Sequence, residues 1–260
     1  MSDEESEGAG SSNVRPLRIH EMIEDEVIDV EYGLTPKPFN QFSPSMVGYC
    51  KRQMYNRKFN LTSMDRYVKG ILHAGTVNHF WLEHHLPEMV ADRAVETEKR
   101  VRVEVPLEDK DFDLYVYGEA DVVDSKGFVY DHKFTGDVSY VKDEPKQKDY
   151  RQVNMYIYGL SDVHTGQLEY VTRDGKFQDA SENVVTHTFG FDEETFNATV
   201  ENMKEVAEKV RIAKMQGTEH INPFDKCEED CFFCEKEVLR PEVKEKLGRN
   251  KPDGNLNDDE

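Results

Sequence analysis

The sequence predicts an α/β fold in which helices flank a mixed central sheet. Stretches with apolar residues at helical spacing alternate along the chain with extended stretches, and three of the extended stretches follow one another directly. With 260 residues the chain can bury one sizeable core, so we expect a single domain over residues 15–240. We expect the polar and charged ends at residues 1–14 and 241–260 to be disordered.

Two helices are expected before the first strand. The segment 43–59, SPSMVGYCKRQMYNRKF, starts with a capping Ser and predicts a short helix that carries Cys50 in its middle or at its end. The segment 68–90 predicts a second helix, which is interrupted or restarts near Gly75 and ends near Pro87.

Three extended runs follow these helices, at residues 100–107, 112–124 and 127–135. The first two alternate apolar and polar residues strictly, which is typical of half-buried strands. The tetrapeptide DSKG at 124–127 separates the second run from the third and predicts a tight hairpin turn.

The remaining elements complete the predicted sheet. The segment 143–160 predicts a helix with Asp143 as a cap, and strands are expected at 167–174 and 184–191. Asp192 then caps a long amphipathic helix that Gly217 ends. Its repeating apolar residues are Phe196, Val200, Met203, Ala207 and Val210.

Composition limits the class of protein. Apolar residues make up 37% and charged residues 33% of the chain, as in a soluble globular protein. The sequence has no run of about 18 apolar residues, so no membrane span is expected. The acidic start MSDEESEGAG lacks the apolar stretch of a signal peptide, and we expect a cytoplasmic protein with reduced cysteines.

The net charge of −20 argues against nucleic acid as a partner at first sight, because phosphates require Lys and Arg. Basic residues nevertheless cluster at 50–58 and 146–151, so a basic groove on an acidic body is compatible with the sequence. The candidate phosphate contacts are Lys51, Arg52, Arg57, Lys146, Lys148 and Arg151.

Two carboxylates and a lysine form the first candidate site. Asp131 and Lys133 point to one face of the third strand and His132 to the other, while the hairpin can bring Asp121 beside Asp131. Two adjacent carboxylates repel unless a positive group lies between them, and Mg²⁺ prefers oxygen ligands of this kind. Lys133 would then lie near the metal-bound water and the phosphate, where it would either lower the pKa of the water or stabilise developing charge. Ordinary salt bridges between solvated strand residues are the alternative.

The flanking helices add further candidates. His79 and Glu83 lie four residues apart before the strands, and Gln152 and Tyr156 lie four residues apart after them. Each pair is a weak signal alone, since a lone His on an apolar helix is more often a satisfied core residue. The signal is stronger because one pair precedes the two carboxylates in the sequence and the other pair follows them.

In this order the motifs SPSMVGYCKRQMY, GTVNHFWLE, GEAD, DHK, QVNMY and CEEDCFFC resemble the RecB-like branch of the PD-(D/E)XK nucleases, which have a restriction-endonuclease-like core. Within that branch they resemble the iron–sulfur exonucleases associated with CRISPR loci and archaeal viruses, over about residues 43–236. The resemblance implies that His79, Asp121, Asp131 and the carbonyl of His132 bind metal, and that Lys133 is catalytic. Gln152 and Tyr156 match a motif that supports the site and the DNA strand. Asp131 stands where many relatives have Glu.

The four cysteines form the second candidate site. Cys227, Cys231 and Cys234 lie within eight positions, too many for one disulfide and one too few for a closed four-thiolate site. The resemblance implies that Cys50 is the fourth ligand of a [4Fe–4S] cluster that joins the two ends of the domain. A zinc ion held by the same four thiolates is the alternative, and free structural thiols are a third reading.

The resemblance thus implies a deoxyribonuclease that depends on Mg²⁺ or Mn²⁺, an exonuclease acting on single strands or free DNA ends. The alternative is a DNA-binding or adaptor module with a cluster and an idle nuclease site. No G-x4-G-K-[ST] motif occurs, so a helicase or a CRISPR integration partner would supply any unwinding. Replication, recombination, repair of ends and CRISPR adaptation are all compatible settings, in the host cytoplasm if the protein is viral.

Overall fold

The structure is a computed structural model that describes residues 37–63, 75–172, 183–227 and 231–249, except residues 78, 82–83, 89, 91–92 and 236. All of them belong to the unit formed by Gly33–Glu260. The helices and strands are β1 Gln41–Phe42, α2 Pro44–Val47, α3 Lys51–Phe59, β2 Thr62–Ser63, β3 Val95–Val105, β4 Leu114–Asp124, β5 Phe128–Thr135, η1 Ser139–Val141, α5 Gln147–Gly159, β6 Thr165–Thr172, β7 Val184–Gly190, α7 Glu193–Gln216, α8 Phe232–Glu235, β8 Val238–Leu239 and α9 Pro241–Arg249.

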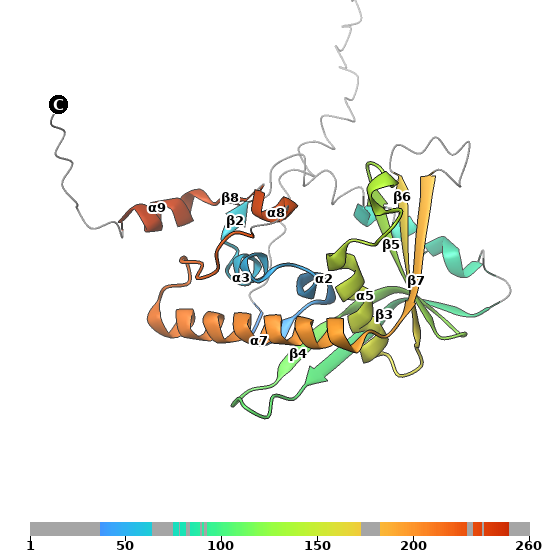
Figure 1. The fold of residues 1–260 in the computed structure, drawn as a ribbon, viewed down its shortest axis with the longest axis horizontal. Coiled ribbons are helices and arrows are strands. Elements are labelled where there is room, and N and C mark those ends of the chain that lie inside the picture. Colours follow the sequence, from blue (N-terminus) through green and yellow to red (C-terminus); the bar gives the residue numbers. More distant parts are fainter. Residues whose placement is uncertain are drawn as a thin grey trace, which may run out of the picture. The chain divides into compact units, whose positions relative to one another are not determined.

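The central sheet is mixed, as predicted (Figure 1). Strands run in the order β1-β4-β5-β6-β7, with β3 also paired to β4. β3 pairs antiparallel along the whole of β4 and therefore occupies one edge of it. β1 pairs parallel with β4 at Tyr115 and Val116, and β5 pairs antiparallel at Val122 and Val123, so these two strands share the other edge. The stretch of β4 between them is where the candidate site lies.

Helices cover the sheet and bury its apolar side chains. α5 packs on β3, β5 and β6, and α7 packs on α3 and α5. The approach of α5 is close, because a Cβ on Gly166 of β6 would lie 2.4 Å from Val153 of α5. α2 lies against β4 in the same way, since a Cβ on Gly118 would lie 2.5 Å from Pro44 Cδ. A continuous core joins these elements.

The predicted turn and the predicted long helix are confirmed. In the hairpin, Gly127 has φ +83° and Asp124 Oδ1 accepts hydrogen bonds from the amides of Lys126 and Phe128. In α7, Asp192 Oδ1 accepts a hydrogen bond of 3.1 Å from the amide of Thr195, and Gly217 ends the helix in the left-handed conformation. Local side-chain chemistry therefore sets these boundaries.

The predicted helix over 43–59 is wrong in one respect, because it is two helices with a break at residues 48–50. Gly48 lies so close to α5 that a Cβ there would be 2.2 Å from the carbonyl oxygen of Lys148. Cys50 is extended, with ψ 160°, and precedes α3 as its N-cap. The contact between α2 and α5 thus decides where the chain leaves the helical conformation.

The structure also extends beyond the predicted C-terminal boundary at residue 240. Residues 241–249 form α9, where Val243 is buried and Leu247 packs against the core. Their spacing of four places both on one helical face. Residues 1–14, 64–74 and 250–260 lie outside the described residues. Within the described part of the chain, no helix combines the length and apolar character that crossing a membrane requires.

Gly48 offers a test of this packing. Its φ of −68° suits any residue, so Gly48→Ala adds a steric clash with the α5 backbone and no conformational strain. We expect the free energy of unfolding to fall by about 1–3 kcal/mol, measured by urea denaturation. Gly190→Ala is the control, since its Cβ would meet an atom only at 3.9 Å. Equal effects of the two substitutions would contradict the packing argument.

Candidate active site and metal centre

The carboxylate site forms where β4 and β5 separate. The two strands pair at Val122 with Tyr130 and Val123 with Val129, which places Asp121 and Asp131 next in the same register. Backbone pairing stops there, and Asp121 Oδ2 instead accepts a hydrogen bond of 3.1 Å from the amide of His132. β5 meanwhile stays fully paired with β6. The split therefore leaves two carboxylates at the edge of an opening in the sheet.

Asp131 is fully buried and lies in a network of hydrogen bonds from α5. Gln152 Nε2 donates to Asp131 Oδ1 at 3.1 Å and also lies 2.8 Å from Tyr156 Oη. Tyr156 in turn donates to the carbonyl of Glu119 at 2.9 Å. That carbonyl lies on the stretch of β4 between β1 and β5. The predicted Gln and Tyr thus connect the helix to the split of the sheet.

Lys133 carries the positive charge of the site. Its Nζ lies 2.7 Å from Asp131 Oδ2 and donates to Gln152 Oε1 at 3.3 Å. Burial lowers the pKa of Lys133, but the carboxylates of Asp131, Asp149 and Asp121 outweigh this and hold the pKa above its usual value. The lysine is therefore an ammonium at neutral pH.

Burial acts in the opposite sense on the carboxyls. It raises the pKa of Asp131 to about 6, although Lys133 opposes the shift, and it raises the pKa of Asp121 as well. Asp131 Oδ2 has the ion pair to Lys133 but no hydrogen bond with suitable geometry among the described residues. The site consequently holds more negative charge than Lys133 alone satisfies.

His79 approaches Asp121 from the helical segment that precedes the sheet. Its Nδ1 lies 3.2 Å from Asp121 Oδ2, and its ring meets that of Phe134 edge-on. Burial, and then the charge of Lys133, lower the pKa of His79. The imidazole is neutral at pH 7 as a result and has a lone pair to offer. Glu83, the other predicted residue of this helix, lies outside the described residues.

His132 faces the opposite side of β5 from Asp131 and Lys133, as predicted. Its Nδ1 lies 2.6 Å from Glu169 Oε2 on β6. Burial lowers the pKa of His132, but the hydrogen bond to Glu169 outweighs this and raises it. The side chain is thus engaged outside the opening, and only its backbone remains on the side of the carboxylates.

Two residues of the site, Asp149 and Tyr170, and Glu169 on the opposite face of β5 were missed by the sequence analysis. Asp149 is buried on α5 and accepts a hydrogen bond of 3.0 Å from Tyr170 on β6. Asp149 lies three residues before Gln152, so helical spacing could have found it. Glu169 and Tyr170 depend on the register of β5 against β6, which pairs them with His132 and Lys133. No local pattern reveals that register.

The donor set fits a hard divalent cation. Two carboxylates and a neutral imidazole gather where β4 and β5 separate, and among the described residues the close partner of Asp131 Oδ2 is the Lys133 ammonium at 2.7 Å. Oxygen donors of this kind suit Mg²⁺, and an added imidazole suits Mn²⁺. In the arrangement described here, Asp121 contacts His79 while Asp131 contacts Lys133, so these groups do not all converge on one point.

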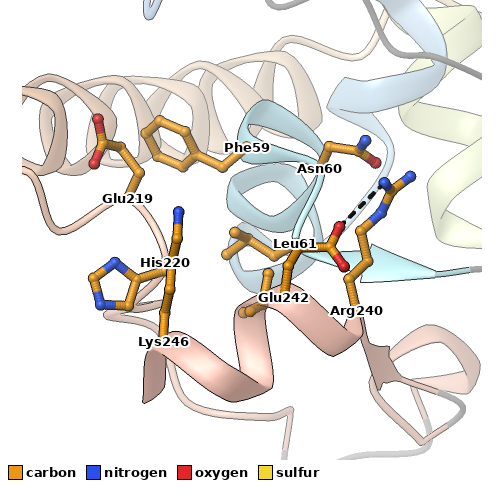
Figure 2. Close-up of a pocket in the computed structure, with 9 residues that line it drawn as sticks. Phe59, Asn60, Leu61, Glu219, His220, Arg240, Glu242 and Lys246 are labelled. Carbon is orange, nitrogen blue, oxygen red and sulfur yellow. Dashed lines mark ion pairs between the residues drawn. The ribbon is translucent and has the colours of Figure 1, made fainter. Parts of the chain in front are cut away.

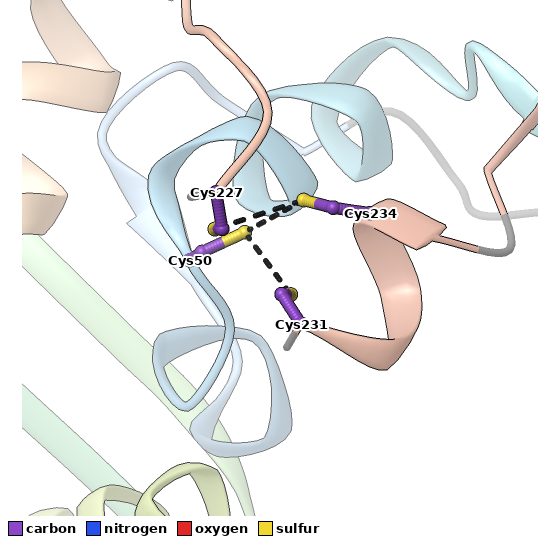
Figure 3. A group of neighbouring side chains, drawn as sticks. All are labelled: Cys50, Cys227, Cys231 and Cys234. Carbon is purple, nitrogen blue, oxygen red and sulfur yellow. Dashed lines mark hydrogen bonds between the residues drawn. The ribbon is translucent and has the colours of Figure 1, made fainter. Parts of the chain in front are cut away.

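The four cysteines do converge. Their sulfur atoms all lie within 4.8 Å of one another, the one group of three or more His, Cys, Asp or Glu among the described residues that does so. Cys50 precedes α3, while the other three come from the segment that leads into and forms α8 (Figure 3). Burial raises the pKa of Cys50 above its usual value and that of Cys227 to about 11. A bound cation would hold such thiols as thiolates.

A second connection joins α3 to the same C-terminal segment. Arg52 donates through Nε and a terminal nitrogen to both carboxylate oxygens of Glu237, at 2.8 and 2.6 Å. Gln53 and Asn56 donate to Glu237 as well. The side chain of Glu237 is 3% exposed, and that of Arg52 is 16% exposed. This buried network holds the segment beside Cys50 without a metal.

Some of the predicted phosphate contacts form ion pairs with carboxylates, and others lie over tyrosine rings. Arg52 is committed to Glu237, which corrects its assignment as a phosphate contact. Lys51 pairs with Glu205 at 2.6 Å and Lys148 with Asp149 at 3.3 Å. Arg57 lies over the ring of Tyr49 at 4.1 Å, and Lys146 over that of Tyr140 at 4.8 Å.

A pocket of about 230 Å³ lies elsewhere, between the end of α3, the turn after α7 and α9 (Figure 2). Phe59 and Leu61 form its apolar wall, while Arg240 pairs with Glu242 across its rim at 3.6 Å. Glu219 and Lys246 add one charge of each sign. None of the predicted site residues lines this pocket, so it does not belong to either site.

The fold and these two sites define an α/β protein with a carboxylate and lysine site at the split of its sheet and a four-cysteine centre. No known family model and no curated protein matches the chain. The protein SSO0001 shares its fold, with a TM-score of 0.53, 19% identity, and coverage of 72% of this chain and 86% of that one.

Two solved exonucleases show weaker likeness. An alkaline exonuclease from Laribacter hongkongensis gives a TM-score of 0.45 at 8% identity, covering 70% of this chain and 96% of that one. A phage-related exonuclease from Haemophilus somnus 129PT gives 0.36 at 18%, covering 54% and 73%. Likeness at this level does not establish a common activity.

The buried pair of Arg52 and Glu237 can be compared with its exposed neighbour. We expect Glu237→Ala to lower the free energy of unfolding by about 3–5 kcal/mol, because Arg52 would stay buried without a counter-charge. Glu205→Ala is the matched control, since Lys51 and Glu205 are 39% and 44% exposed, and we expect a loss of about 1 kcal/mol or less. Denaturant unfolding measures both. A Glu237→Ala variant as stable as the control would show that the network does not hold the segment.

Proposed function

We propose that this protein is a metal-dependent DNA nuclease, an exonuclease that acts on single strands or free ends. The observation that carries the proposal is the pair Asp121 and Asp131 beside Lys133 where the sheet splits. Crowded, buried carboxylates are costly to keep ionised, and a structural role does not require them. A cation site for phosphodiester hydrolysis gives them a use. The weak likeness to solved exonucleases is compatible with this but does not carry it.

Each residue of the site has a proposed role. His79, Asp121, Asp131 and the backbone carbonyl of His132 would hold Mg²⁺ or Mn²⁺. The cation would supply Lewis-acid polarisation of the phosphate and would favour deprotonation of water. Lys133, kept protonated by its carboxylates, would stabilise the charge that develops on the phosphate.

Gln152 and Tyr156 act as positioning groups in this proposal. Gln152 hydrogen-bonds both Asp131 and Lys133, so it fixes the carboxylate and the ammonium relative to each other. Tyr156 anchors that amide to the carbonyl of Glu119 on β4. The two strands and α5 are thereby held at one spacing, which catalysis by positioned groups requires.

The four-cysteine centre is proposed to bind a [4Fe–4S] cluster, on the strength of the family resemblance of its sequence motifs. Zinc is the alternative, and the sulfur separations of 3.6, 3.7 and 3.9 Å favour it. A single tetrahedral ion with bonds of about 2.3 Å needs sulfurs about 3.8 Å apart. A cluster binds each thiolate through a different iron, so the sulfurs would have to move apart.

An idle nuclease site in a DNA-binding or adaptor module is the second candidate function. The cysteine centre and the Glu237 network would serve such a module equally well. Lys133 distinguishes the two, since binding without cleavage does not require a buried ammonium between carboxylates. The proposed settings are replication, recombination, repair or CRISPR adaptation, with a helicase or integration partner providing unwound DNA.

The nuclease proposal is tested with purified full-length protein, labelled single-stranded DNA and Mn²⁺ under anaerobic conditions. We expect Lys133→Ala to reduce the cleavage rate about 10²- to 10³-fold, because the charge on the phosphate would lose its stabilising ammonium. Lys209→Ala, on the exposed face of α7, should cleave at the wild-type rate. If the wild type cuts no faster than Lys133→Ala, the site is idle and the second candidate stands.

The identity of the cysteine-bound metal is tested on the same anaerobic preparation. A [4Fe–4S] cluster should give a broad visible absorption band and four iron atoms per chain, both lost in Cys50→Ala. Zinc is d¹⁰ and colourless, so a colourless protein with one zinc per chain would overturn the cluster assignment. In either case we expect Cys50→Ala to lower stability or DNA binding and to leave the carboxylate site unchanged.

A further inference from the structure

An exposed tyrosine ring lies beside the end of the strand that carries the proposed catalytic residues. Tyr140, in η1, is 58% exposed, which is unusual for so large a ring. Its hydroxyl contacts Oγ1 of Thr135, the last residue of β5. Because strand side chains alternate, Asp131, Lys133 and Thr135 share one face, and Thr135 lies about 7 Å beyond Lys133. The hydroxyl of Tyr140 therefore lies beside β5 two residues beyond Lys133, on the face that carries Asp131 and Lys133.

Lys146 lies against the same ring. Its Nζ donates to Tyr140 Oη at 3.2 Å and lies 4.8 Å from the ring centroid. The centroid of the Tyr170 ring lies 5.9 Å from the same Nζ, and the backbone amide of Lys146 donates to Tyr170 Oη. No carboxylate of the described residues forms an ion pair with Lys146, in contrast to Lys51 and Lys148. The Lys146 ammonium is thus held against the two rings and has no carboxylate partner within the part of the chain that the structure describes.

We propose that Tyr140 and Lys146 form a subsite for one unpaired nucleotide of the DNA strand, with the base stacked on the Tyr140 ring and a phosphate bound by Lys146. Every base has a π-face that can stack on an aromatic ring, so such a subsite tolerates any sequence. A base inside a duplex has both faces covered by its neighbours and cannot stack in this way. This inference rests on the proposed function and specifies how a single strand is selected over a duplex.

Binding without cleavage tests the subsite. Anisotropy of a labelled single-stranded oligonucleotide is measured on full-length protein without added divalent cation, so that no cutting is needed. We expect Tyr140→Ala to weaken binding about 5- to 100-fold, and Tyr140→Phe, which keeps the ring, to bind within about twofold of wild type. Lys146→Gln should make the fall of log K with log salt shallower by about 0.7. Duplex binding should not change with Tyr140→Ala.

Matched controls come from the other end of α5 and from α7. Tyr158 is 46% exposed and lies about 18 Å from Lys146 along α5, and Lys209 is exposed on α7. Tyr158→Ala and Lys209→Gln should each bind the single strand as wild type does. Unfolding midpoints of all variants are recorded, and the salt slope of Lys146→Gln remains informative if Tyr140→Ala does not fold.

Three outcomes would overturn the subsite. Tyr140→Ala could bind as wild type, Tyr140→Phe could lose as much as Tyr140→Ala, or the controls could weaken binding equally. The second outcome would show that Tyr140 acts through its hydroxyl contact with Thr135 and not through its ring. These results are independent of the cleavage assay with Lys133→Ala, so a protein that binds strands through Tyr140 but does not cut would retain the subsite and lose the nuclease function.

Discussion

The burial of the Asp131 carboxylate is the constraint on which the rest of this structure depends. A fully buried carboxylate is costly unless charge and hydrogen bonds compensate for lost water. Lys133 and Gln152 provide both, at 2.7 and 3.1 Å. Gln152 can reach Asp131 only if α5 lies across β5, and its bond to Tyr156 carries the connection to Glu119 on β4. One buried charge therefore sets the spacing of a helix and two strands around the opening in the sheet.

Buried charge and hydrogen bonds also join α3 to the C-terminal segment that carries Glu237. The break before α3 leaves Cys50 extended at the start of the helix, and the following turns present Arg52, Gln53 and Asn56 to Glu237. The three late cysteines and Glu237 thus lie against Cys50 and the first part of α3. Because the Glu237 network needs no metal, it can place the three late cysteines near Cys50 before any metal binds. The polar network thus holds the C-terminal segment against α3 independently of the cysteines.

Sequence reasoning succeeded where local chemistry decides. The DSKG turn, the Asp192 cap and Gly217 set their boundaries through bonds within a few residues, and strand alternation placed Lys133 and Asp131 on one face. It failed where a distant element decides. The helix break at Gly48 follows from the backbone of Lys148, a hundred residues later. Glu169 meets His132 only through the parallel register of β5 and β6, and α9 packs on the core through Val243.

The acidic character of the chain limits which interactions could give it affinity for DNA in the proposed function. Of the basic residues that cluster in the sequence, Arg52, Lys51 and Lys148 are paired with carboxylates, while Lys146 and Arg57 lie on tyrosine rings. With so few uncommitted cations among these five residues and a net charge of −20, counterion release alone would give little affinity for a long duplex. Stacking does not depend on net charge, and a divalent cation held by Asp121 and Asp131, as proposed, would reverse the local sign of the field. In the proposed function both would act at a strand that is unpaired near the site, so the acidic body is compatible with the proposed preference for single strands and ends over duplex DNA.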